Sequence, residues 1–262
     1  MKKTILIIAS LLISAFAIQA QDITLDEILA NYFENTGGID NWKTVKGVRM
    51  KATVNQDGMD IPITLIQMTD GRKYMKFELQ GKEVAQGVFD GEVAWSHNFM
   101  TMKPEKSDNE TTENIKREIG VFPSPFLNYE EKGYKVELLG KETAEGTECF
   151  KIKLTKKPQL VDGKEVDNVE FYFFDTENFV PIMAESEIKT GQMKGMVSVA
   201  TFSDYQEVDG LFFAFSIGQG LKDKGSQTIN FDSIELNPEV DDAIFKFPEE
   251  TETTEEKKED GK

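Results

Sequence analysis

The chain has 262 residues, with 30 Lys and Arg against 47 Asp and Glu, so its formal net charge is -17. Proteins that bind nucleic acid or anionic membranes concentrate positive charge, so this balance argues against both classes. The single cysteine, Cys149, excludes an intramolecular disulfide, and the single histidine, His97, excludes a histidine-rich metal site. No cofactor is expected.

The first residues have the pattern of a secretory signal peptide. A basic start, Met1-Lys2-Lys3, precedes a mostly apolar run from Ile5 to Ile18, and Ala20 supplies a small residue at the end. The run is shorter than the ~20 residues of a membrane-spanning helix. We expect cleavage near Ala20, a periplasmic product without a lipid anchor, and no transmembrane segment after cleavage. Residues 1–20 are therefore predicted to be the leader and residues 21–248 a single domain.

The domain is predicted to open with an amphipathic helix. Thr24 and Glu27 have the spacing of a capping box. A stripe of apolar residues follows at helical spacing, and Gly37-Gly38 is expected to end the helix. Ile39 to Trp42 fits a short second turn of helix.

From Val48 the apolar period changes to two, which indicates strands. Turn dipeptides recur along the rest of the chain, at Asp57-Gly58, Asp70-Gly71, Gln80-Gly81, Asp90-Gly91, Glu145-Gly146, Asp162-Gly163 and Asp209-Gly210. Short strands between such turns predict a mainly β (α+β) fold, with a curved antiparallel sheet of about eleven strands. The pattern leaves a sandwich or a barrel open.

One insertion interrupts this pattern in mid-chain. Lys103 to Asn114 is polar and is predicted to be a loop, and Glu113 to Ile119 is compatible with a helix. An apolar, proline-broken elbow follows at residues 122–127, and strands resume at Tyr134. Residues 249–262 carry seven acids and no apolar residue, so they are predicted to be a solvated, disordered tail.

His97 is the first candidate for chemistry. By alternation it shares a strand face with Val93, Trp95 and Phe99. It is either a catalytic base or ligand contact, or a hydrogen-bonded histidine near a pocket rim. The second interpretation is favoured, because no partner residues for catalysis are visible.

Three other motifs have simple structural interpretations. Asp241-Asp242 fits a turn before Phe245 better than a paired acid and base, because neighbouring strand side chains point apart. Cys149 fits a small buried hydrophobic residue. Gly218-Gln219-Gly220 leads into a turn and fits a hairpin. No enzyme is expected.

Two strands are apolar on both faces, at residues 171–174 and 211–213. Such strands must be covered on both faces. One face is expected to meet a core, and the other to lie under a helix or to line an apolar cavity. The methionines fit either a surface that accepts varied apolar ligands or ordinary core filling.

Five segments, in their order and spacing, resemble one family. They are YFENTGG at 32–38 followed by Trp42, SPFLNY at 124–129 followed by Lys132-Gly133-Tyr134, FDTENFVP at 174–181, SDYQEVDGL at 203–211, and NPEVDDAIFKFP at 237–248. Together they resemble the exported outer-membrane lipoprotein-sorting-like proteins of Bacteroidetes, related to the LolA and LolB carriers. One departure is Ala214, where the family pattern leads us to expect a proline.

The resemblance implies an incomplete antiparallel barrel whose open face is plugged by helices. It also implies a periplasmic carrier of acyl chains, with the mid-chain helical insertion acting as a lid. Burial alone stabilises such a complex, by ~0.8 kcal/mol for each CH₂ removed from water.

We therefore predict a monomeric carrier of a lipid or lipoprotein acyl chain, with possible envelope protein partners. Alternation and the resemblance select nine ligand-binding candidates in the cavity and lid: Met50, Met75, Trp95, Phe99, Met100, Met102, Phe122, Phe126 and Leu127. The alternatives are an interaction or sensor module of the same fold without lipid, and an enzyme that uses His97 or paired acids on envelope lipids or glycans.

Overall fold

The computed structural model describes residues 23–56, 58–79 and 81–248. The predicted leader and acidic tail therefore lie outside the described residues. The helices are α1 (Leu25–Asn35), α2 (Ile39–Trp42) and α3 (Asn109–Arg117), with a 3₁₀ turn η1 (Asp242–Phe245) near the end. The strands are β1 (Gly47–Gln56), β2 (Met59–Met68), β3 (Lys73–Leu79), β4 (Lys82–Phe89), β5 (Ala94–His97), β6 (Pro104–Lys106), β7 (Lys135–Ala144), β8 (Thr147–Thr155), β9 (Gln159–Val161), β10 (Lys164–Val166), β11 (Val169–Asp175), β12 (Pro181–Glu187), β13 (Val197–Val208), β14 (Leu211–Leu221) and β15 (Ser226–Leu236).

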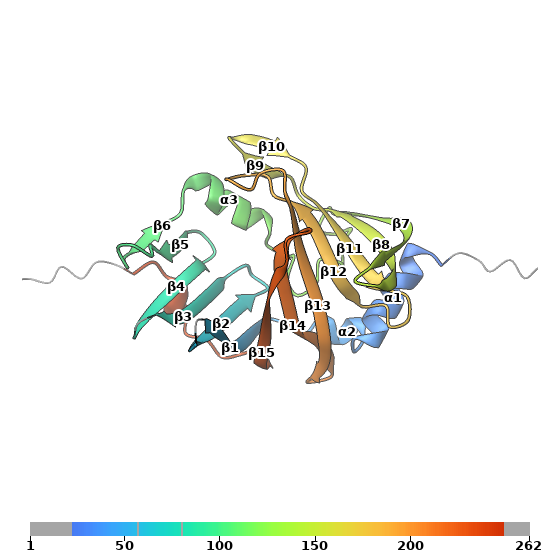
Figure 1. The fold of residues 1–262 in the computed structure, drawn as a ribbon, viewed down its shortest axis with the longest axis horizontal. Helices are drawn as coiled ribbons and strands as arrows, with labels where there is room; N and C mark the ends of the chain where they lie inside the picture. Colours follow the sequence, from blue (N-terminus) through green and yellow to red (C-terminus); the bar gives the residue numbers. More distant parts are fainter. Residues whose placement is uncertain (1–22, 57, 80, 249–262) are drawn as a thin grey trace, which may run out of the picture.

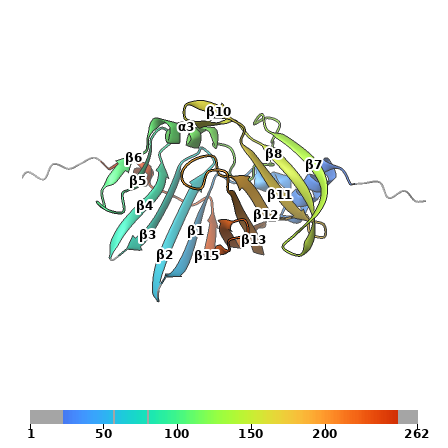
Figure 2. The same cartoon turned by 45° about the horizontal axis from the view of Figure 1, so that its top comes forward.

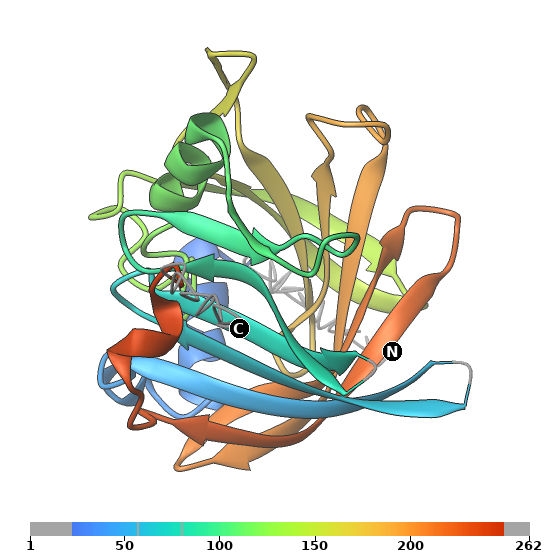
Figure 3. The same cartoon turned by 90° about the vertical axis from the view of Figure 1, so that its left-hand side faces the viewer.

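One large antiparallel sheet dominates the molecule (Figure 1). In the described part of the chain it has thirteen strands in the order β6-β5-β4-β3-β2-β1-β15-β14-β13-β12-β11-β8-β7. Consecutive strands pair throughout, except that β1 meets β15 and β8 meets β11. The edge strands β6 and β7 do not pair with each other, so the sheet is strongly curved but unclosed (Figure 3). The predicted fold class is confirmed.

The N-terminal helix forms as its sequence predicts. The Thr24 hydroxyl accepts the Glu27 amide at 3.3 Å, and the Glu27 carboxylate accepts the Thr24 amide at 2.8 Å. This capping box satisfies amides that the helix leaves unpaired. The helix ends before Gly37, whose φ of 108° disfavours other residues.

The mid-chain insertion differs from its prediction. The expected loop contains β6, and α3 begins at Asn109 instead of Glu113. The cause is Asp108, whose carboxylate accepts the Thr111 amide at 2.7 Å and so starts the helix earlier. The apolar elbow at residues 122–127 follows α3 as expected.

Different elements pack on the two faces of the sheet. We call the concave side, which faces α1, α2, α3 and the elbow, the inner face (Figures 2 and 3). In β1, Val48 and Ala52 are buried on this face while Lys51 and Thr53 are exposed on the other, which confirms the predicted alternation. The largest cluster of buried residues joins α1, α2, the elbow and strands β8 and β11.

The outer face of β2 to β5 is covered by the C-terminal segment. Phe245 of η1 is almost fully buried there against Ile66, Tyr74 and Trp95. Asp241 begins the turn, because its carboxylate accepts the Ala243 amide at 2.9 Å. The predicted turn before Phe245 is thus confirmed.

Candidate functional site

The inner face contains an apolar cavity of about 250 Å³. It lies where β1 and β11 to β15 face the elbow and the first two helices. The lining residues are Tyr32, Trp42, Val48, Met50, Phe122, Pro123, Ser124, Pro125, Phe126, Tyr172, Pro181, Phe202, Tyr205, Phe212, Phe213, Ala214, Ile217 and Ile234. Because few polar atoms line it, the cavity suits an apolar group.

Half-buried apolar side chains continue this lining across the inner face. Residues directly opposite in antiparallel strands share a face, and the register places Met50 opposite Leu65, and Leu65 opposite Met75. On the other side, Ile217 stands opposite Ile229. We call this surface, from Met75 to Ile217, the inner trough. Its side chains remain partly accessible, so the trough is not a fully packed core.

The elbow is held firmly over the cavity. Phe126 packs edge-on against Tyr32, Tyr172 and Phe174, with ring centroids 6.4, 5.0 and 5.2 Å away. Lys132 Nζ donates to the Ser124 carbonyl at 2.9 Å. Burial lowers the pKa of Lys132 to about 8 and raises that of Tyr32 to about 12.

Phe126 and Leu127 are buried in the main core, so in this structure they form part of the wall beside the cavity. Movement of the insertion as a lid stays a prediction. Phe122 and Phe126 line the cavity, and Phe122 is only partly buried. A substitution such as Phe126→Asp would test the core, and would not report on lid movement.

Of the other predicted residues, Met50 lines the cavity and Met75 lies in the inner trough. Trp95 lies on the opposite face, where its Nε1 donates to the Phe245 carbonyl at 2.9 Å. This differs from the prediction because the C-terminal segment gives the outer face an apolar cluster of its own. Alternation alone does not say which apolar face is the inner one.

The remaining candidates lie in the turn between β5 and β6, outside the cavity lining. Phe99 is 58% exposed and stacks on Phe77 at 6.1 Å, and Met100 is 94% exposed. Met102 has a φ of 56° in the same turn. None of the three lines the cavity.

Sequence reasoning missed several lining residues, although a signal was present. Tyr172 and Phe213 belong to the two doubly apolar strands, which were expected to be covered on both faces. That expectation is confirmed for β11: Phe173 is buried in an outer-face cluster and Phe174 in the main core. Ala214, the departure from the family pattern, lines the cavity opposite Tyr205.

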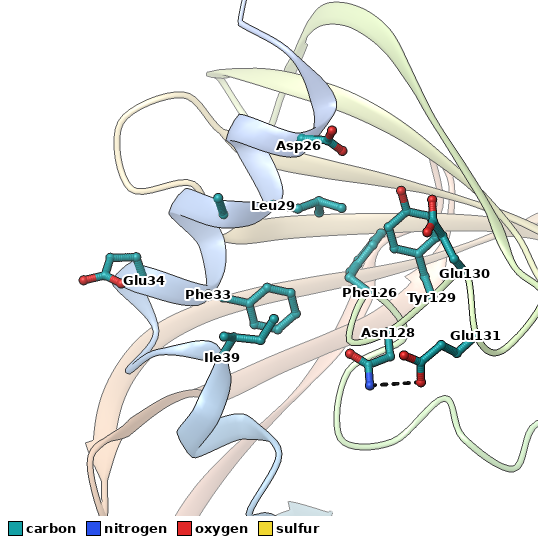
Figure 4. Close-up of a pocket in the computed structure, with 11 residues that line it drawn as sticks. Asp26, Leu29, Phe33, Glu34, Ile39, Phe126, Asn128, Tyr129, Glu130 and Glu131 are labelled. Carbon is teal, nitrogen blue, oxygen red and sulfur yellow. Dashed lines mark hydrogen bonds between the residues drawn. The ribbon is translucent and has the colours of Figure 1, made fainter.

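A second, larger cavity of about 660 Å³ lies between α1 and the loop at residues 126–131 (Figure 4). Leu29, Phe33 and Ile39 supply apolar surface. Asp26 and Glu34 on the helix side, and Glu130 and Glu131 on the loop side, make its rim acidic. This rim suits an apolar or anionic ligand less well than the inner cavity does.

A buried polar network lies near the end of α3. Lys156 Nζ donates to Glu118 at 2.8 Å and to Glu170 at 2.7 Å, and Tyr172 Oη donates to Glu170 at 2.8 Å. Burial alone would lower the pKa of Lys156, but the two carboxylates raise it.

Within the described ranges, the buried Tyr134 hydroxyl has no hydrogen-bond partner.

His97 and Cys149 occupy positions that fit structural roles. His97 Nδ1 lies 2.9 Å from the Ala85 amide, positioned to accept it, so this is a hydrogen-bonded histidine on a strand. Cys149 is fully buried. In residues 23–248, apart from the two gaps, His, Cys, Asp and Glu side chains form no group of three or more suited to a metal ion. No helix in these same ranges has the length and apolar character to cross a membrane.

Comparisons give similar folds and no curated relative. A family model described as "Uncharacterized protein" matches residues 127–248, and no curated protein matches the chain. A structure from Vibrio parahaemolyticus, described as an outer membrane lipoprotein-sorting protein domain, is 12% identical with a TM-score of 0.48, and covers 84% of this chain and 94% of its own. A LolA superfamily protein from Nitrosomonas europaea is 14% identical with a TM-score of 0.48, covering 86% and 98%. A DUF1329 family protein from Desulfovibrio piger is 15% identical with a TM-score of 0.43, covering 84% and 97%.

Proposed function

We propose that the chain is a periplasmic carrier that holds a lipid or lipoprotein acyl chain in the inner cavity and trough. The observation that carries the proposal is the apolar cavity on the inner face of an unclosed sheet, which shares Met50 and Ile217 with the trough. Burial of the chain supplies the binding free energy, at ~0.8 kcal/mol for each CH₂, and requires no catalytic group.

The size of the cavity supports use of the trough as well. Its volume of about 250 Å³ is slightly below the roughly 300–1,000 Å³ of typical small-ligand sites. An acyl chain would therefore fill the cavity and continue along the half-buried side chains between Met50 and Met75. Export rests on the pattern of residues 1–20, which lie outside the described residues.

The test compares the two cavities directly. The mature chain, Gln21–Lys262, is purified from the periplasm, examined by native mass spectrometry and extracted with organic solvent. Binding of a fluorescent fatty-acid probe is then measured for wild type, Ala214→Phe and Ala30→Phe. Ala214 lines the inner cavity and Ala30 lines the cavity beside α1, so the same substitution fills each in turn.

We expect a co-purified lipid or acylated peptide, and roughly tenfold weaker probe binding for Ala214→Phe alone, since blocking two methylenes removes about 1.6 kcal/mol of burial. Loss of binding only in Ala30→Phe would move the site to the cavity beside α1. An empty protein that binds no probe would contradict the carrier and favour an envelope interaction module of the same fold.

A further inference from the structure

Lys73 is a cation on the inner face, which is mostly apolar in the trough. In the ladder between β2 and β3 it stands opposite Gln67, two residues along from the pair Met75 and Leu65, so it shares their face. Its side chain borders a small pocket of about 40 Å³ beneath the end of α3, together with Gln67, Glu118 and Phe122.

The Lys73 ammonium has no partner among the described residues. No carboxylate of those residues lies within 4 Å of its Nζ, in contrast to Lys156, which contacts two. Glu118 acts on Lys73 from a greater distance, but its two carboxylate oxygens already accept from Lys156 and Asn168. Burial lowers the pKa of Lys73, and Glu118 only partly opposes this effect. A half-buried cation without a partner costs some free energy, which a bound anion would offset.

The small pocket adjoins the apolar cavity. Phe122 lines both, so Lys73 lies close to the site proposed for the acyl chain. Polar groups at this end of the inner face include Lys73, Gln67 and the network around Lys156. Lys132 lies beside Gly120 of the same pocket, and its Nζ donates to the Ser124 carbonyl. Of these cations, Lys73 alone has neither an ion-pair partner nor a hydrogen-bond acceptor in the described part of the chain.

We infer that Lys73 binds the anionic headgroup of an amphiphile whose acyl chain fills the inner cavity, with the Gln67 amide as a second donor. The inference rests on the proposed function and adds the substrate class: a molecule with one acyl chain and an anionic oxygen headgroup, either carboxylate or phosphate monoester. The carboxylate or phosphate oxygen accepts from Lys73 Nζ, and the chain passes Phe122 into the cavity. Charge-assisted hydrogen bonds of this kind are stronger than neutral ones, so they distinguish an anionic headgroup from a neutral one.

The test measures selectivity for headgroup charge at constant chain length. Dissociation constants are determined for hexadecanoate against hexadecanol, and for a lysophosphatidic acid against the monoacylglycerol of the same chain. The proteins are the mature wild type, Lys73→Met, Lys73→Arg and Lys76→Met. Lys76 is the matched control, because it lies three residues along β3 from Lys73 and so points to the outer face, where it pairs with Glu83 at 2.6 Å.

We expect wild type to bind at least one anion about tenfold or more tightly than its neutral partner. The preference should disappear in Lys73→Met with the neutral ligands unaffected, persist in Lys76→Met, and be largely retained in Lys73→Arg. The ligand pair that shows the preference for the anion identifies the headgroup as a carboxylate or a phosphate.

Two outcomes would overturn the inference in different ways. Equal weakening of charged and neutral ligands in Lys73→Met, or no change, would show that Lys73 only balances the charge of Glu118. Absence of binding for all four ligands in wild type would remove the proposed function together with this inference. If Lys73→Met fails to fold, Lys73→Gln is measured in its place, with the same expected loss of the preference.

Discussion

The buried ammonium of Lys132 in the elbow makes the stability of the domain depend on pH. Its ammonium donates to the Ser124 carbonyl, and burial lowers its pKa from the ordinary 10.5 to about 8. In the unfolded chain the pKa returns to its ordinary value. Between pH 8 and about 10.5 the unfolded state therefore binds more protons than the folded state, and the free energy of unfolding rises with pH.

We predict that this rise is lost in Lys132→Met. The measurement is urea unfolding of wild type and variant at pH 8, 9 and 10, with the exposed Lys135→Met as control. The difference in unfolding free energy, wild type minus Lys132→Met, should increase with pH, because tyrosines that titrate in the same range affect both proteins equally. Curves that stay parallel across this range would contradict the buried position of the ammonium.

At the residue scale, the sequence predicts strand faces better than it predicts sites. Alternation correctly places Trp95 and His97 on one face, and Met50 on an apolar face of β1. It does not reveal that Trp95 faces the C-terminal segment, because Phe245 is distant in sequence and comes next to Trp95 only after folding. Tyr172 and Phe213 were visible as members of doubly apolar strands, but no local pattern marks them as cavity residues.

At the element scale, α3 is attached by polar contacts and has no buried residue. Asn114 exchanges two hydrogen bonds with the Leu160 backbone, at 2.9 and 2.7 Å. Arg117 donates to the Pro158 carbonyl at 2.8 Å, and Glu110 accepts the Gly163 amide at 2.7 Å. These contacts join α3 to the hairpin of β9 and β10, beside the opening of the inner face (Figure 2). Net hydrogen bonds are worth only about 1 kcal/mol each, so this unit can separate at small cost.

We predict that Asn114→Ala loosens α3 and the hairpin while the rest of the domain stays intact. Hydrogen exchange should accelerate at the Leu160 amide and within α3, and global stability should fall by no more than about 2 kcal/mol. The exposed Asn109→Ala serves as control, since its side chain makes no hydrogen bond to the hairpin in the described part of the chain. Uniformly faster exchange across β11 to β14 in Asn114→Ala would instead make α3 part of the cooperative core.

The sequence predicts the position of α3 only approximately, because the helix has few apolar residues. The pair Glu113 and Arg117 marks a helix but does not mark its start, and α3 has no apolar stripe to set its length. Asp108 was the available signal, because aspartate is a preferred N-cap. Strands β6, β9 and β10 are three residues each, too short for alternation to detect.

At the scale of the whole molecule, recurrent turns and alternation predict the mainly β class. They do not predict the long-range contacts that complete the fold. The pairing of β1 with β15 joins the two ends of the chain, and no local pattern specifies it. The C-terminal segment then crosses the outer face of β2 to β5. The half of the sheet that carries Met75 and Lys73 on its inner face therefore depends on residues 240–247 for cover on its outer face.

This dependence predicts that Phe245→Ala damages the inner face from the opposite side of the sheet. Phe245 is 1% exposed, its carbonyl accepts from Trp95, and Arg72 lies 5.1 Å from its ring centroid. Removing a buried phenylalanine typically costs about 3–5 kcal/mol. We expect urea unfolding to show a loss of that size, and probe binding at 37 °C to weaken with it. Deletion of residues 249–262, which contain no apolar residue, is the control and should change neither quantity. If Phe245→Ala lowers stability by less than about 1 kcal/mol, the segment is a surface appendage, and β2 to β5 are stable without it.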